Sequence, residues 1–105
     1  MRKFIRIAIP TDDSDINGRI SESLMSCKYF MLIDIADREI TNVSLLINSR
    51  EIVEKLKENK VNLVVLAYVG PVLVEIFEKR GIGVLMAYRR EIKSILREQF
   101  HVKLE

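Results

Sequence analysis

Four carboxylates within a short stretch are the first candidates for chemistry, because together they could bind a hard cation. They are Asp12, Asp13, Asp15 and Glu22. Carboxylate oxygens are ligands that magnesium prefers, and a magnesium site would permit hydrolase or nuclease chemistry. Short acidic side chains are also typical of turns, where they hydrogen-bond to nearby backbone groups. We favour the turn interpretation and keep a small metal-dependent hydrolase or nuclease as the third functional hypothesis.

Sulfur-bearing side chains lie just after these carboxylates in the sequence, and they could bind a soft metal. Cys27 lies between Met25 and Met31. Thiolate and thioether groups bind copper and iron–sulfur species, but sulfur side chains beside a strand also fill hydrophobic cores. We favour the core position and keep Cys27 as the one soft-ligand candidate. His101 has no sequence neighbour that would complete a triad, so we predict no catalytic residue and no enzyme activity.

A basic group near the start of the last predicted helix could contact phosphates. Its members are Arg89, Arg90, Lys93 and Arg97. Glu91 and Glu98 interrupt this group, and the whole chain carries a formal charge of only +2 from 17 basic and 15 acidic residues. We therefore do not expect nucleic acid as a partner.

Composition predicts one globular domain over residues 1–105, with 49% hydrophobic and 30% charged residues. A chain of this length buries roughly 65% of its unfolded surface, enough for one core. A single Cys excludes an internal disulfide and suits a reducing compartment. The sequence shows neither a signal-peptide pattern nor a run of ~20 apolar residues, so we expect a cytoplasmic protein with no membrane partner.

Three strands are expected in the first half of the chain. Ile5, Ile7 and Ile9 alternate with other residues and precede Pro10, which marks the strand's end because it cannot donate a ladder hydrogen bond. A polar loop follows. Two β-branched and aromatic runs, 29–35 and 40–47, are joined by only four residues. Such a short connection predicts an antiparallel hairpin.

A helix is expected after the hairpin, extending to about Asn59. Asn48 is its predicted N-cap, with Glu51 completing a capping box. A βαβ unit then follows, with strands at 63–67 and 84–86 and a helix at 71–80. Crossovers of this length join parallel strands with a right-handed connection.

Helix boundaries and packing faces can be predicted for the second half of the chain. Pro71 suits the first helical position and Gly81 suits a left-handed C-cap. The packing stripe of this helix is expected to be Val72, Leu73, Ile76 and Phe77. A last helix is expected at 90–100. The predicted core comprises Ile7, Ile9, Ile52, Leu56, Val64, Leu66, Leu73, Phe77, Ile92 and Leu96.

Four short segments resemble one family in order and spacing. They are Ile7-Ala8-Ile9-Pro10-Thr11-Asp12, Ile20-Ser21-Glu22, Tyr29-Phe30 and Gly70-Pro71. Together they resemble the dinitrogenase iron-molybdenum cofactor biosynthesis family, also called nitrogenase accessory factor-like, over nearly the whole chain. The α/β pattern predicts a three-layer α/β/α sandwich. The resemblance implies a ribonuclease H-like topology, a mixed five-stranded sheet of order 3-2-1-4-5 with the second strand antiparallel.

The resemblance also implies a carrier or assembly factor for iron-molybdenum cofactor precursors. One departure concerns the family's usual Ser-Glu-His-Phe-Gly, which is here Ser21-Glu22-Ser23-Leu24-Met25. The imidazole implicated in holding the cluster is therefore absent at Ser23. The usual Gly- and His-rich loop before the first main helix is also reduced, here to residues 48–50. Together these departures predict a degenerate ligand site.

A ligand site is expected where the carboxyl ends of the first and fourth strands meet, because open α/β sheets leave a crevice at such a switch point. The Gly70-Pro71 helix start would offer unpaired N–H groups to an anion. The predicted cofactor-binding residues are Thr11, Asp12, Ser21, Glu22, Cys27, Gly70 and Pro71. The leading hypothesis is a non-enzymatic binding protein for a metal-cluster or other anionic ligand. The alternative is a regulatory or protein-interaction module without cofactor, and the sequence leaves open the cofactor, the protein partner and the oligomeric state.

Overall fold

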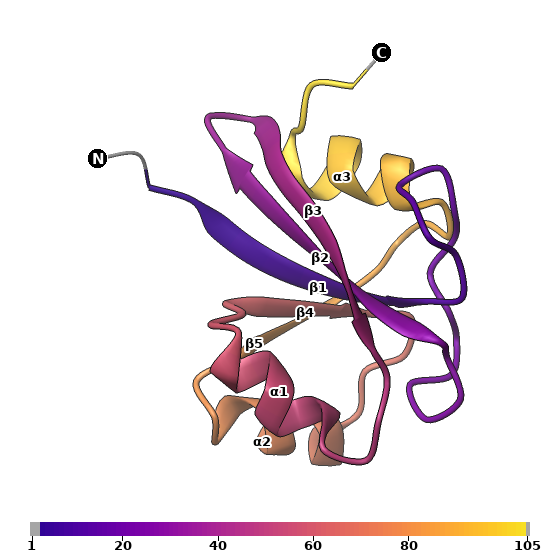
Figure 1. Ribbon diagram of the computed structural model, residues 1–105, viewed down its shortest axis with the longest axis vertical. Helices are drawn as coiled ribbons and strands as arrows, with labels where there is room; N and C mark the ends of the chain where they lie inside the picture. The colour runs from indigo at the N-terminus through magenta and orange to yellow at the C-terminus, as the bar shows by residue number, and fades with distance from the viewer. Residues whose placement is uncertain (1–2, 105) are drawn as a thin grey trace.

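The computed structural model describes residues 3–104. Helices cover both faces of a single twisted sheet, with α3 on one side and α1 and α2 on the other (Figure 1). The elements in chain order are β1 (Ile5–Thr11), β2 (Tyr29–Ala36), β3 (Glu39–Ile47), α1 (Ile52–Glu58), β4 (Leu63–Leu66), α2 (Pro71–Glu78), β5 (Gly83–Met86) and α3 (Ile92–Phe100). The predicted three-layer α/β/α arrangement is confirmed.

The sheet has five strands in the order β3-β2-β1-β4-β5. β2 is antiparallel to both of its neighbours, whereas β1, β4 and β5 run parallel. The predicted strand order and direction are therefore confirmed. One boundary was wrong, because Pro10 lies inside β1 opposite Phe30 and the strand ends at Thr11. The ladder between β1 and β4 covers only Ile7 and Ala8, so a missing N–H at Pro10 removes no bond to β4.

The hairpin between β2 and β3 turns through two residues, Asp37 and Arg38. Their φ angles are 52° and 66°. Positive φ at both central positions is the requirement of a type I′ turn, whose twist matches that of the flanking strands. The short connection read from the sequence thus produces the predicted antiparallel hairpin, although neither turn residue is Gly.

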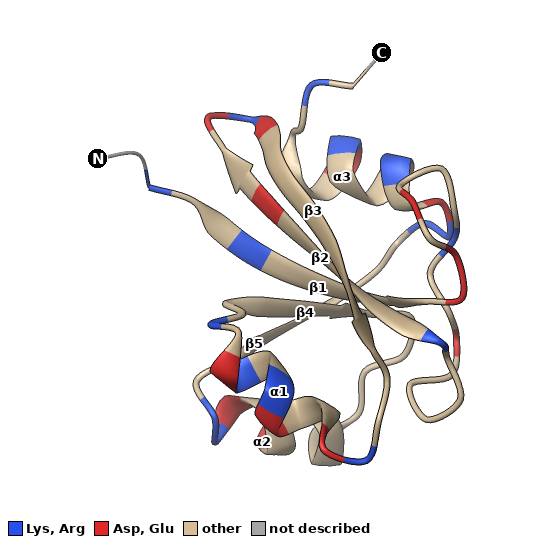
Figure 2. Ribbon diagram, in the orientation of Figure 1, with Lys and Arg blue, Asp and Glu red and all other residues tan. Residues whose placement is uncertain are grey.

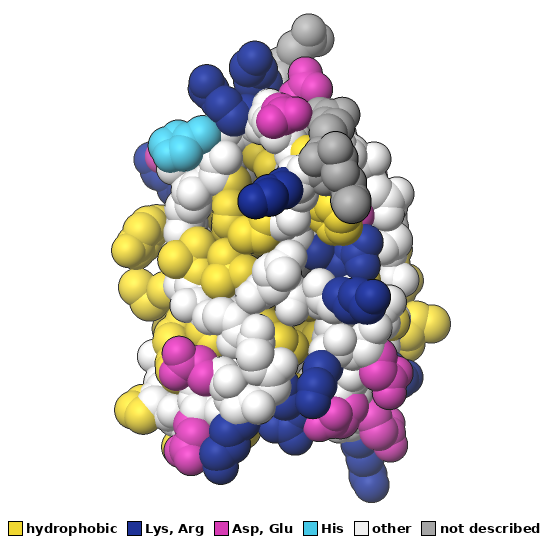
Figure 3. Space-filling view, turned by 90° about the vertical axis from the view of Figure 1, so that its left-hand side faces the viewer, with side chains coloured by type: hydrophobic (Ala, Val, Ile, Leu, Met, Phe, Trp, Pro, Cys, Tyr) yellow, Lys and Arg dark blue, Asp and Glu magenta, His cyan; other side chains and the backbone are white. Residues whose placement is uncertain are grey.

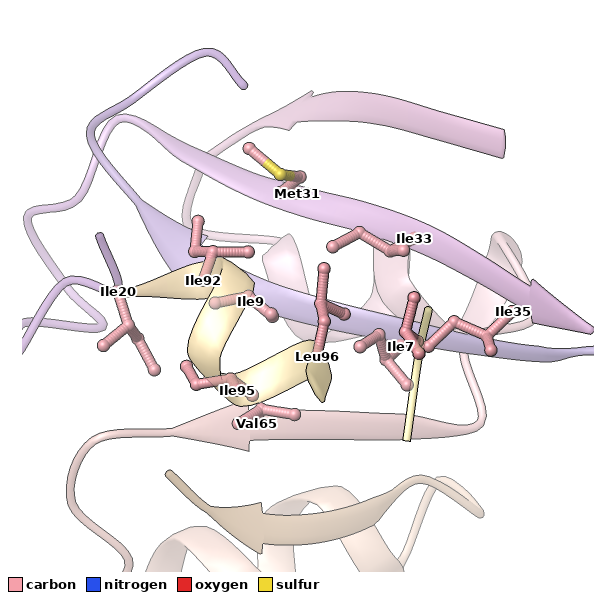
Figure 4. Close-up of a cluster of buried hydrophobic side chains, with 11 residues drawn as sticks. Ile7, Ile9, Ile20, Met31, Ile33, Ile35, Val65, Ile92, Ile95 and Leu96 are labelled. Carbon is pink, nitrogen blue, oxygen red and sulfur yellow. The ribbon is translucent and has the colours of Figure 1, made fainter. Parts of the chain in front are cut away.

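The face under α3 carries one hydrophobic cluster (Figure 4). Alternate residues of β1 and β2 point to this face, because successive strand side chains alternate between the two sides of a sheet. Its buried members are Ile7, Ile9, Ile20, Met31, Ile33, Ile35, Val65, Ile92, Ile95, Leu96 and Val102. Ile92 and Leu96 of α3, both predicted to be core residues, are therefore confirmed as buried.

The opposite face carries a second cluster under α1 and α2. Its buried members are Ala8, Cys27, Phe30, Leu32, Ile52, Leu56, Val61, Val64, Leu66, Phe77 and Ile82. Nine of the ten predicted core residues are buried, and Leu73 is half-buried. Val72 does not belong to the packing stripe of α2, since it is 70% exposed. Its position at the start of α2 places it beyond the edge of the sheet face that Phe77 covers.

The start of α1 differs from the prediction. Its N-cap residue is Glu51, which makes no capping side-chain bond, and the helix begins at Ile52. The Asn48 side chain instead donates to the carbonyl oxygens of Leu24 and Cys27, each at 3.0 Å. The capping role predicted for Asn48 is wrong because its amide connects two loops. Gly81 has the predicted positive φ, 74°, after α2.

One ion pair connects β1 to β2, and its arginine also bonds to the residue after α1. Arg6 on β1 donates from Nε and Nη2 to the two carboxylate oxygens of Asp34 on β2, at 2.7 and 3.0 Å. Its Nη1 donates to the carbonyl of Asn59, just after α1, at 2.7 Å. The bond to Asp34 and its charge raise the pKa of Arg6 against the opposing effect of burial. Asp34 is thus a buried carboxylate whose two oxygens are both paired.

Charged residues lie mainly on the helices and loops, and the strands carry few of them (Figure 2). Viewed from the left-hand side of Figure 1, charged side chains crowd the lower rim, where α1 and α2 lie, and hydrophobic ones gather higher up (Figure 3). None of the helices within residues 3–104 has the length and apolar character needed to cross a membrane.

Candidate functional site

The carboxyl end of β1 is held by a long loop that crosses to α3. The Ser21 amide donates to the Pro10 carbonyl at 2.7 Å, and the Ile20 amide donates to the Arg90 carbonyl at 2.8 Å. The Thr11 hydroxyl, fully buried, donates to the Arg19 carbonyl at 2.6 Å. These bonds fix the loop over the end of the sheet, where the sequence predicts the ligand crevice.

Three acidic residues of this loop accept hydrogen bonds from backbone amides. Asp12 accepts from the Lys28 amide at 2.9 Å, Asp13 from the Arg19 amide at 2.8 Å, and Asp15 from the Asn17 amide at 2.8 Å. Within residues 3–104 no group of three or more His, Cys, Asp or Glu side chains is placed to hold a metal ion. Of these contacts only the Asp15 bond is local to a turn, whereas Asp12 and Asp13 connect more distant parts of the loop, and the described residues do not form the hard-cation cluster.

A hollow lies at the carboxyl ends of β1, β4 and β5, and we call it the switch-point hollow. One half, of about 80 Å³, is lined by Pro10, Ser21, Glu22, Leu24, Leu66, Ala67, Tyr68 and Leu73. The other half, of about 140 Å³, is lined by Ile20, Ala67, Tyr68, Ala87, Tyr88, Arg89 and Arg90. Ala67 and Tyr68 border both halves, so the residues following β4 divide the hollow in two.

Two arginines place positive charge beside the hollow, and both have acidic partners. Arg90 pairs with Glu22 across the rim. Arg89 pairs with Glu98 of α3 at 2.9 Å, and this hydrogen bond and charge raise the pKa of Arg89. Arg89 and Arg90, two members of the predicted basic group, thus both pair with carboxylates. His101 lies apart, at the left-handed C-cap of α3, where it is exposed.

Apolar side chains are exposed around the same end of the molecule. Ten large hydrophobic side chains are exposed within residues 3–104. Six of them belong to the loops and helix start at this end: Met25, Tyr68, Val69, Val72, Met86 and Tyr88. Exposed apolar residues gathered around a concave surface are typical of ligand or protein interaction sites. We call these six residues the apolar rim.

The seven predicted site residues do not line one cavity. Ser21 and Glu22 line the switch-point hollow, but Thr11 and Asp12 are engaged in the bonds described above and line none of the cavities described here. Gly70 and Pro71 border an open groove of about 710 Å³ on the outer side of α2. A Cβ atom added at Gly70 would meet no atom within 4 Å, so the fold itself does not require glycine there.

Cys27 lines a third cavity, the wedge pocket, between the loop before β2 and helices α1 and α2. This pocket has a volume of about 370 Å³ and is lined by Leu24, Met25, Cys27, Asn48, Ser49, Arg50, Ile52, Val53, Leu73, Ile76 and Phe77. The Cys27 side chain is buried, and its Sγ accepts a hydrogen bond from Asn48 at 3.4 Å. Burial, with the negative charge of Asp12 as a smaller effect, raises the pKa of the Cys27 thiol. The thiol is therefore protonated near neutral pH, and a metal would have to displace its proton to bind.

Met25 lines the same wedge pocket as Cys27, but Met31 does not. Met31 is buried under α3, on the opposite face of the sheet, and Met25 is 90% exposed. The predicted core position of Cys27 is confirmed. The wedge pocket also holds an unusual polar group, because Ser49 Oγ is buried without a hydrogen-bond partner. Such a group costs about 1 to 3 kcal/mol unless a ligand or water satisfies it.

The sequence interpretation missed the two tyrosines and the Glu22–Arg90 ion pair of the hollow. A signal was present, since Leu66-Ala67-Tyr68 and Met86-Ala87-Tyr88 each follow a predicted strand with the same Ala-Tyr pair. Parallel neighbouring strands end at the same edge, so equivalent positions of β4 and β5 must lie side by side there. The Glu22–Arg90 pair carried no such local signal because it joins distant parts of the chain.

The family comparison agrees with this architecture. The model of the family described as dinitrogenase iron-molybdenum cofactor matches residues 4–100. The chain belongs to this family. The chain is 27% identical, over 119 aligned positions, to the uncharacterized protein MJ0580 of Methanocaldococcus jannaschii, and the alignment covers 98% of this chain and 92% of that protein.

Solved structures support the fold alone, since all those compared here are below 25% identity. The crystal structure of PH0822 has 24% identity and a TM-score of 0.81, with 96% of this chain and 93% of that chain covered. The NMR structure of TM1290 from Thermotoga has 19% identity and a TM-score of 0.75, covering 92% and 88%. The apo form of the orange protein from Desulfovibrio gigas has 14% identity and a TM-score of 0.67, covering 96% and 92%.

Proposed function

We propose that this family member is a non-enzymatic cytoplasmic binding protein that carries an anionic iron–sulfur or iron–molybdenum cofactor precursor in the switch-point hollow. The observation that carries the proposal is the position of the hollow at the carboxyl ends of β1, β4 and β5. Open α/β sheets bind ligands at this place, where connections leave the sheet in opposite directions. The ribonuclease H-like classification implied by the resemblance belongs to the same proposal.

The chemistry of the hollow supports an anionic cargo held mainly by hydrogen bonds. Arg89 and Arg90 border the hollow, and an anionic cargo would have to replace Glu98 or Glu22 as their partner, just as it would have to replace the Ser23 carbonyl that the Ser21 hydroxyl now donates to at 3.2 Å. Thiol and imidazole groups are absent from the residues that line the two halves. Metal–ligand bonds from the hollow are therefore few, and the affinity for the cargo is expected to be low. Ser23 lies between lining residues, on the loop that borders the hollow.

Restoring an imidazole tests this proposal. In an anaerobic transfer assay, Ser23→His should raise uptake of an iron–sulfur–molybdenum precursor, because imidazole adds a metal ligand beside the hollow. Ser14→His, on an exposed part of the preceding loop, is the matched control and should leave uptake unchanged. If both His variants take up the precursor equally and Cys27→Ala abolishes uptake, the binding site would be the wedge pocket instead of the hollow. Uptake unaffected by any of the three would contradict carriage at either place.

A protein-interaction module is the second candidate, and the apolar rim is the observation that favours it. Exposed side chains such as Tyr68 and Tyr88, 62% and 74% accessible, suit a protein surface as well as a cluster. Metal analysis of protein purified without oxygen separates the two candidates. Iron and molybdenum contents equal to a blank would favour the interaction module. A nuclease is disfavoured, since Asp12, Asp13 and Asp15 of the first loop each accept a hydrogen bond from a backbone amide.

A further inference from the structure

The wedge pocket has the form of a small-molecule site, and it adjoins the switch-point hollow, with which it shares the lining residues Leu24 and Leu73. It opens where the loop before β2 meets the start of α1 and the middle of α2. Arg80 connects the two helices beside it, pairing with Glu54 of α1 and donating from Nη1 to the Ile76 carbonyl at 3.0 Å. The helices are thus held together on one side of the pocket, while the walls remain mostly aliphatic and aromatic. An apolar cavity of this size with a few polar groups is typical of ligand sites.

The polar groups of the pocket define which end of a ligand would bind where. The buried Ser49 hydroxyl has no hydrogen-bond partner, and its neighbour Arg50 is the single charged residue among the lining residues. At Cys27, the negative charge of Asp12 adds to the effect of burial in raising the pKa of the thiol. An anionic group is therefore favoured beside Ser49 and Arg50, and disfavoured beside Cys27.

We propose that the wedge pocket binds a small monocarboxylate with an apolar body, whose carboxylate accepts hydrogen bonds from Ser49 and Arg50. The body would lie against Leu73, Ile76 and Phe77. A volume of about 370 Å³ is enough for an aliphatic or phenyl-substituted acid of about ten non-hydrogen atoms. Binding of this kind goes beyond cofactor carriage, and its success or failure leaves the proposal for the switch-point hollow untouched.

Titration with sodium octanoate, followed by backbone amide chemical shifts of the full chain, tests the inference. The shifts should concentrate at residues 49–53 and 73–77 and at Cys27. 1-Octanol, with the same chain and no charge, should bind more weakly, and 3-phenylpropionate shows whether the pocket prefers an aromatic body. Octanoate should also slow the alkylation of Cys27 by iodoacetamide at least fivefold at saturation, because its chain would cover the thiol.

Matched variants test the two polar contacts. Arg50→Gln should weaken octanoate binding about tenfold, the effect of one charge-assisted hydrogen bond. Lys57→Gln, an exposed change on α1 away from the pocket, should leave it unaltered. Ser49→Ala should weaken binding severalfold while the amide spectrum confirms an intact fold. The inference would be overturned by the absence of shifts at the pocket up to millimolar acid, by octanol binding as tightly as octanoate, or by equal effects of the two charge substitutions.

Discussion

The Arg6–Asp34 ion pair allows a quantitative test of how β1, β2 and the end of α1 are held together. Asp34→Asn keeps the shape of the side chain and removes its charge, so two hydrogen bonds between opposite charges become at best one bond from the guanidinium to a neutral amide oxygen. A charge-assisted bond contributes about 1.5 to 3 kcal/mol, and removing one partner of a fully buried pair costs about 3 to 5 kcal/mol. The Arg6 side chain is 26% exposed, against 9% for Asp34. Water can therefore solvate part of the unpaired guanidinium, and we expect a loss of about 2 kcal/mol.

Urea denaturation of the wild type, Asp34→Asn, Arg6→Gln and the double variant would measure this coupling. The double-mutant cycle should give an interaction energy of about 1 to 2 kcal/mol. Glu75→Gln is the control, because the Glu75–Lys79 pair on α2 is more than half exposed and should contribute less than about 0.5 kcal/mol. If the stability losses of the two single variants simply add in the double variant, the interaction energy is zero. That result would refute the conclusion that this ion pair holds β1, β2 and the end of α1 together.

Two further predictions concern the core and the thiol. Phe77→Ala should lower the free energy of unfolding by about 3 to 5 kcal/mol in urea denaturation, because Phe77 is fully buried, whereas Val72→Ala on the same helix should change it by less than about 0.5 kcal/mol. A similar loss for both would contradict the packing of α2. Burial raises the pKa of the Cys27 thiol above its ordinary value of 9.0 in the folded state. Its contribution to stability is therefore fully present below pH 9.0. It should be lost as the pH rises from 9.0 through the higher pKa of the folded state. Cys27→Ala should reduce that fall in stability, and identical pH profiles would show that the thiol is not desolvated.

The hairpin, the βαβ unit and most of the core could be predicted because local patterns dictate them, whereas the strand order was implied by the family resemblance. Runs of β-branched residues define β2 and β3, and a short connection permits only an antiparallel return. Pro71 and Gly81 mark the ends of α2 through their own backbone preferences, which owe nothing to distant residues. Side-chain burial then follows from alternation along each strand.

The candidate site was harder to predict because its parts depend on tertiary contacts. Asn48 has the residue type and position of a helix cap, yet its amide bonds to Leu24 and Cys27 in another loop. Gly70-Pro71 was correctly placed at the start of α2 but borders a groove separate from the hollow. Spacing along the chain could not distinguish these cavities, since that distinction depends on which side of α2 each residue faces.

The central position of β1 has a consequence for how the chain is made. The antiparallel meander of β1, β2 and β3 can close once Ile47 has left the ribosome, whereas the other edge of β1 pairs with Leu63 and Val64, which are synthesised later. Until then the nascent chain presents an unpaired strand edge beside uncovered apolar faces, the combination that promotes self-association. Synthesis from the N-terminus therefore exposes, for a short time, a strand whose residues 7–11 are all buried in the native protein. Binding by a chaperone would be most effective against self-association during that interval.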